Sequence, residues 1–186
     1  RDLHSFPTRR SSDLSVEHVA YEALRQLGLD QTLTALGFNQ PQLAAAIGTI
    51  VGRMVSPGSE LYTHSWLTQH SGLGELIEHD FTISLMQLYR ISDQLFKHKA
   101  AIEKGLYQRE RDLFEFEEVI TLYDLTNTYF EGSGISNANA AFGKSKEKRT
   151  DCPLVTLALV LDGSGFPKQS EIFAGNTGED VRQVDI

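Results

Sequence analysis

The feature that most constrains this chain is a change of sequence pattern near Glu117. Before this point, apolar residues recur three and four positions apart, which is the spacing of amphipathic helices. After it, short runs of β-branched and aromatic residues alternate with segments rich in Gly, Ser and Asn, as strands and loops do. We therefore expect a mixed chain, α+β or α/β, with a helical domain over 15–116 and a strand-containing domain over 117–186.

Helical spacing is clearest in two segments of the first domain. One predicted helix has an apolar face made of Val16, Val19, Ala20, Ala23, Leu24 and Leu27, and Gly28 is its expected stop. A second predicted helix covers 42–55. A further helix is expected to start at Pro57, with this proline in its first turn, and to include 59–70. Residues 84–114 are predicted to form one long helix or two.

The first fourteen residues, "RDLHSFPTRRSSDL", differ from the rest. They have no periodicity and no apolar face, and they lack the apolar segment of a targeting peptide. Their sequence resembles the translation of a short-read sequencing adapter. We expect 1–14 to be non-native and the natural sequence to begin near Ser15, so this arm carries no argument about function.

Composition narrows the class of protein. The net charge is −8, so binding to nucleic acid would need a local basic patch. The chain has one cysteine, Cys152, which excludes an internal disulfide framework and a multi-cysteine zinc site. No apolar run approaches the roughly 20 residues of a membrane span. The cytoplasm is therefore the expected location.

Asp124 is the first candidate functional residue. It follows the apolar run "VITLY", and the run is expected to be a central strand that ends on this carboxylate. At a strand end, Asp124 could cap a turn, with Thr126, Asn127 and Thr128 continuing as a loop. It could equally be held as a ligand of a hard divalent cation.

Other carboxylates are weaker candidates. Asp162 begins "DGSG", a turn signal between two predicted strands, so we expect a turn residue in a hairpin. Glu171 is expected at a solvated strand position. Glu179 and Asp180 are typical of the first turn of a helix.

A local basic patch follows in "GKSKEKR", Gly143 to Arg149. Four cations surround one carboxylate, Glu147, in an otherwise acidic chain. Such a run is often only a solvated face. It lies between the strand of Asp124 and the predicted hairpin, so it could also grip DNA phosphates. The candidate DNA-binding residues are Lys144, Ser145, Lys146, Lys148 and Arg149.

Taken in order, these elements resemble the DDE transposases of bacterial insertion sequences. The resemblance rests on Asp124 with Thr126, then Gly143 to Arg149, Asp151 with Pro153, Asp162-Gly163 with Phe166-Pro167, and Gly175-Asn176. It covers 119–176, and the helical part resembles the amino-terminal region of the family more loosely.

The resemblance implies the opening strands of an incomplete RNase H-like domain, and a fragment that is inactive alone because the later Asp and Glu of the triad have no counterpart here. It implies that Asp124 is catalytic and binds Mg²⁺ or Mn²⁺ during DNA cleavage and strand transfer. It also implies DNA as partner, a dimer on paired DNA ends, and a bacterial protein at the nucleoid. Two alternatives are another RNase H-like nuclease and a non-catalytic, DNA-binding or inhibitory remnant.

Overall fold

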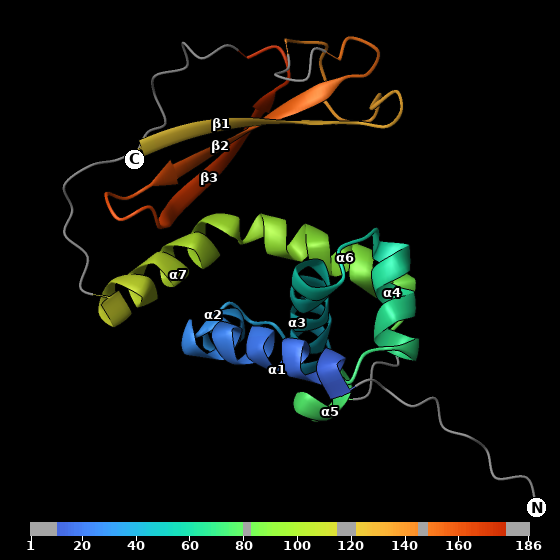
Figure 1. The fold of residues 1–186 in the computed structure, drawn as a ribbon, viewed down its shortest axis with the longest axis vertical. Coiled ribbons are helices and arrows are strands. Elements are labelled where there is room, and N and C mark those ends of the chain that lie inside the picture. Colours follow the sequence, from blue (N-terminus) through green and yellow to red (C-terminus); the bar gives the residue numbers. More distant parts are fainter. Residues whose placement is uncertain (1–10, 80–82, 115–121, 145–148, 178–186) are drawn as a thin grey trace, which may run out of the picture. The chain divides into compact units, whose positions relative to one another are not determined.

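The structure, a computed structural model, describes the backbone of residues 11–79, 83–114, 122–144 and 149–177. Side chains are described for the same residues except 11–15 and 122–124. The chain divides into two compact units, Arg1–Glu110 and Arg111–Ile186. Helices build the first unit and the described strands lie in the second, which makes this a mixed α+β chain (Figure 1). The predicted boundary at 116/117 lies outside the described residues, as do residues 1–10 of the adapter-like arm.

Seven helices are present among the described residues. They are α1 Ser11–Gln26, α2 Leu29–Ala35, α3 Gln40–Val55, α4 Glu60–Gln69, α5 Leu73–Leu76, α6 Leu85–Lys97 and α7 Lys99–Phe114. The segment 84–114 is therefore two helices. The last four residues of the adapter-like arm form the start of α1.

Local sequence explains several helix ends. Asn39 and Gln42 form a reciprocal capping box at the start of α3. Gly28 stops α1 as expected, and its φ of 66° suits glycine. The expectation for Pro57 is wrong, because Ser59 caps α4 by accepting a hydrogen bond from the Tyr62 amide. A side-chain acceptor thus sets this helix start, two residues after the proline.

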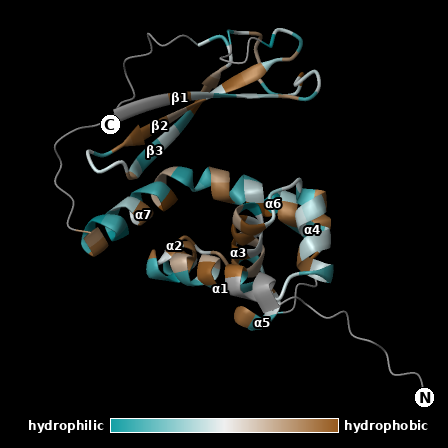
Figure 2. Ribbon diagram, viewed as in Figure 1, coloured by the Kyte–Doolittle hydropathy of each residue, from teal (hydrophilic) through white to brown (hydrophobic). Residues whose placement is uncertain are grey.

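The core of the helical unit surrounds α3. This helix packs against α1, α2, α4 and α6. Leu33, Leu73, Leu88 and Val51 are completely buried around it or on it. Figure 2 shows α3 largely in the hydrophobic colour and α7 mostly in hydrophilic shades. Consistent with this, α7 contributes only half-buried Ile102 and Leu106 to the core.

The apolar face predicted for α1 is partly wrong. Ala20 and Leu24 are buried, but Val16 and Val19 are 53% and 68% exposed. Glu17 is buried instead, where its carboxylate accepts hydrogen bonds from the Ser71 hydroxyl at 3.0 Å and the Gly72 amide at 2.9 Å. Two buried donors at the start of α5 therefore decide which way α1 faces.

The second unit contains an antiparallel sheet. Its strands are β1 Leu122–Tyr129, β2 Leu154–Leu161 and β3 Pro167–Ala174, in the order β1-β2-β3. The β2–β3 hairpin confirms the prediction. Among the described strands β2 is the central one and β1 lies at an edge. The expectation that the strand of Asp124 is central in a complete domain stays a prediction. The helical start expected after Asn176 lies outside the described residues.

Candidate DNA-handling site

Asp124 lies within β1, not at its end. The backbone of β1 pairs with β2 along its whole length, from Leu122 opposite Leu161 to Tyr129 opposite Leu154, and Asp124 is opposite Leu159. The expectations that the strand ends at Asp124, that Thr126 to Thr128 form a loop, and that Asp124 caps a turn are therefore wrong. The β-branched and aromatic residues after Asp124 favour strand, and the apolar β2 offers a partner of equal length.

Asp162 is the turn residue that the sequence predicts. Its Oδ1 accepts hydrogen bonds from the amides of Ser164 and Phe166, each at 2.9 Å, and only 3% of the residue is exposed. Gly165 completes the turn with a φ of 87°. The hairpin therefore uses this carboxylate to organise its own backbone.

The other candidate carboxylates lie in β3 or outside the described residues. Glu171 is half-buried in β3 opposite Ala158, and Glu179 and Asp180 lie outside the described residues. Among the described residues, no group of three His, Cys, Asp or Glu side chains could hold a metal ion. The side chain of Asp124 is not among those described, so its role as a ligand of Mg²⁺ or Mn²⁺ stays a prediction.

Glycines allow three backbone segments of the resemblance to meet at one end of the sheet. Ala141 and Leu154 exchange two backbone hydrogen bonds, at 3.0 and 3.1 Å. A Cβ on Gly143 would overlap the Gly175 carbonyl oxygen, and one on Gly175 would overlap that of Leu154. Only glycine permits this approach, which explains both glycines physically.

Lys144 begins the basic segment on this framework. Its side chain is exposed, and its carbonyl oxygen accepts a 3.3 Å hydrogen bond from the Asn127 side-chain amide. The Asn127 Oδ1 in turn accepts a 3.0 Å hydrogen bond from the hydroxyl of buried Thr156. Ser145, Lys146 and Lys148 lie outside the described residues, so their assignment to DNA stays a prediction.

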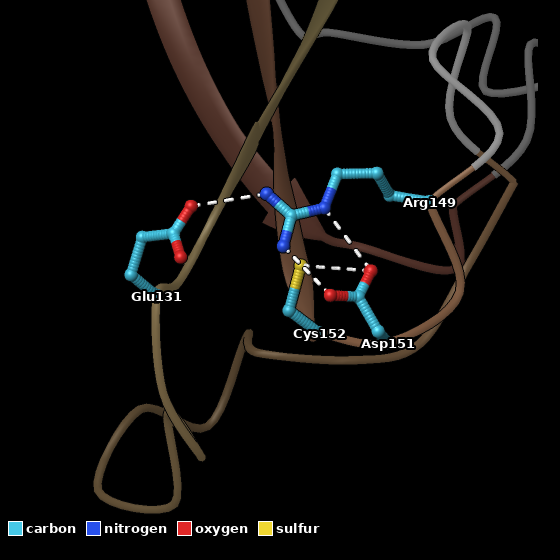
Figure 3. A network of polar contacts seen from close by, with 4 residues as sticks. All are labelled: Glu131, Arg149, Asp151 and Cys152. Carbon is cyan, nitrogen blue, oxygen red and sulfur yellow. Dashed lines mark hydrogen bonds and ion pairs between the residues drawn. The ribbon is translucent and has the colours of Figure 1, made fainter.

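Arg149 is engaged within the protein (Figure 3). Its Nε donates to Asp151 Oδ1 at 3.0 Å and its Nη2 to Oδ2 at 2.7 Å, while Nη1 donates to Glu131 at 3.0 Å. The guanidinium carbon lies 4.9 Å from the centre of the Tyr129 ring, within range of a cation–π interaction. The contacts therefore join the segment that precedes β2 to the end of β1 and the residues just after it.

The same contacts shift the pKa values of Asp151 and Arg149. Hydrogen bonds from Arg149 lower the pKa of Asp151 to about 2. Hydrogen bonds to Asp151 and Glu131 raise the pKa of Arg149 above its usual value. Both groups are therefore charged at neutral pH, and their pairing persists across the physiological range.

The contacts of Asn127, Tyr129 and Glu131 with Lys144 and Arg149 are not predicted from the sequence. Asn127, Tyr129 and Glu131 recur at every second position, which is the period of a strand face. That signal was present, but these residues were expected in a loop, where alternation has no meaning.

Comparison of the chain with protein-family models, with curated proteins and with solved structures gave no match. None of the helices in the described ranges is both long and apolar enough to cross a membrane.

Proposed function

We propose that this protein is a DDE transposase of the insertion-sequence type, which cleaves DNA and transfers strands. In this proposal the sheet unit belongs to an RNase H-like catalytic domain, and Asp124 is the first metal-binding carboxylate. DNA is the substrate, and Lys144 belongs to the surface that contacts its phosphates.

The convergence of the motif elements carries the proposal. Gly143, Arg149 with Asp151, and Gly175 are separated in sequence by up to about thirty positions. They nevertheless share one end of a small sheet, where the contacts described above depend on their particular residue types. A set of residues that matches a family pattern by chance would not be expected to form one interdependent structure.

The position of Asp124 supports a rigid role for it. Its backbone is hydrogen-bonded into β1, with residues on both sides paired to β2. A metal ligand or catalytic carboxylate on a strand is positioned more precisely than one on a loop. A position within the strand thus suits the proposed role as well as a position at its end does.

Nicking and joining assays with an Asp124→Asn variant test this function. Protein expressed from the complete reading frame at its locus is incubated with Mg²⁺ and a plasmid that carries the flanking DNA ends. We expect Asp124→Asn to abolish cleavage and joining while DNA binding is retained. Asp112→Asn, an exposed change in α7, is the matched control and should remain active.

Each other outcome has a defined meaning. Cleavage by Asp124→Asn at the wild-type rate would refute the catalytic assignment. Cleavage without joining by the wild-type protein would favour an RNase H-like nuclease. DNA binding without any wild-type cleavage would favour the non-catalytic alternative.

A further inference from the structure

We propose that Asn127 and Arg149 are positioning residues, and that Lys144, not Arg149, supplies a DNA phosphate contact at this end of the sheet. The inference deepens the proposed function and rests on it. It replaces the sequence-based assignment of Arg149 as a DNA contact with a positioning role.

Three alternate residues of β1 and its extension contact the two described ends of the basic segment, Lys144 and Arg149. Asn127 contacts Lys144, while Tyr129 and Glu131 contact Arg149. The backbone continues to pair beyond β1, because the Phe130 amide donates to the Pro153 carbonyl at 2.9 Å. The supporting residues therefore stand on backbone that is fixed by the sheet.

A hydrogen bond from a buried residue of β2 orients the Asn127 side chain. Thr156 is 2% exposed, and its hydroxyl donates to Asn127 Oδ1. With its oxygen occupied by this donor, the amide presents Nδ2 to the Lys144 carbonyl. This chain of two hydrogen bonds fixes the backbone from which the exposed Lys144 side chain extends.

Arg149 and Lys144 differ in what they can offer a phosphate. A guanidinium binds carboxylates and phosphates through the same planar fork, and Asp151 already accepts from that fork at both oxygens. The ammonium of Lys144 is a compact point charge on a flexible stem, and its side chain is exposed. The geometry thus favours Lys144 as the phosphate contact and Arg149 as the clamp.

A double-mutant cycle tests the role of Asn127. Binding of the full chain to a fluorescent DNA duplex is measured over a range of salt concentrations for Asn127→Ala, Lys144→Ala and the double variant. We expect Lys144→Ala to lower the slope of log affinity against log salt by about 0.9. Asn127→Ala should weaken binding several-fold when Lys144 is present and have almost no effect when it is absent.

Lys104→Ala removes the same charge from an exposed position of α7 and should leave binding unchanged. If Asn127→Ala weakens binding equally in both backgrounds, the positioning role is refuted. If Lys144→Ala binds like the wild type, or if no variant and no wild-type chain binds DNA, the proposed DNA contact itself fails and the inference fails with it.

Arg149 is tested by a charge-neutral exchange. Arg149→Gln combined with Asp151→Asn keeps the net charge and a hydrogen-bonding pair, which protects the fold better than Arg149→Gln alone. We expect the salt slope of this double variant to equal that of the wild type, with a lower melting temperature. A slope smaller by about 0.9 would show that Arg149 contacts a phosphate and would overturn the inference.

Discussion

Different interactions stabilise the interior of the helical unit and the interior of the sheet unit. In the helical unit, large side chains such as Leu33, Leu73 and Leu88 are buried in one apolar cluster. In the described part of the sheet unit, the buried apolar residues are Cys152, Leu154, Ala158 and Val160. There, backbone approach at glycines and a polar network connect the segments. Truncation of a side chain should therefore damage the first unit most, and added bulk should damage the second.

The largest effect is expected from a cavity in the helical core. Leu33 is fully buried, so Leu33→Ala should lower the free energy of unfolding by about 2–5 kcal/mol. Leu61→Ala removes the same atoms from a residue that is 61% exposed, and should change it by less than about 0.5 kcal/mol. Urea unfolding followed by far-ultraviolet circular dichroism measures both. Equal effects would contradict the assignment of the core.

Added bulk at Gly175 gives the matching test of the sheet unit. A methyl group there would overlap the Leu154 carbonyl oxygen, so Gly175→Ala should destabilise the unit by about 1–3 kcal/mol. Gly132→Ala is the control, because nothing lies within 4 Å of its Cβ position. Amide hydrogen exchange at Leu154 reports the local opening. Unchanged protection in Gly175→Ala would mean that the three segments do not meet.

The buried Glu17 refines the comparison of the two units, because it makes polar contacts inside the mainly apolar helical unit. Glu17→Ala leaves the Ser71 hydroxyl and the Gly72 amide without this acceptor, which should cost about 1–3 kcal/mol. Glu17→Gln keeps an acceptor and should recover part of that loss. Thermal unfolding distinguishes the two variants. If Glu17→Ala were as stable as the wild type, the exposed position of Val16 and Val19 would lose its explanation.

The smallest effect concerns pH and the Arg149–Asp151 pair. The pKa of Asp151 is about 2 in the folded chain, below its ordinary value of 3.8. A lowered pKa means that the pairing stabilises the fold above pH 3.8 and is lost as the pH falls through about 2. The melting temperature of the wild type should therefore exceed that of Asp151→Asn at neutral pH, and the difference should shrink over this range. A difference that stays constant with pH would contradict the pairing.

Sequence alone predicts what depends on neighbours along the chain. The spacing of Leu43, Ile47 and Val51 places α3 correctly, and the Asp-Gly signal at Asp162 gives the hairpin. Prediction from sequence fails where a partner distant in the chain determines the local structure. Ser71 and Gly72 turn Glu17 inward, and the full-length pairing with β2 keeps Thr126 to Thr128 in a strand.

The candidate site shows the same division. Asp124 and the basic segment stand out in the sequence because of residue type. The clamp around Arg149 depends on how the end of β1 returns beside the start of β2, and no spacing along the chain reveals that Glu131 contacts Arg149. The residue type of Arg149 thus suggests a contact with DNA phosphates, whereas its hydrogen bonds are made to carboxylates of the protein itself.

Salt-dependent DNA binding tests the central claim most directly. The wild-type chain is compared with a variant in which Lys144, Lys146 and Lys148 become Glu while the clamp residue Arg149 is kept. We predict that the wild type binds duplex DNA with an affinity that falls steeply with salt, and that the variant binds far more weakly with a smaller slope. Equal binding and equal slopes, with both proteins folded, would contradict the account.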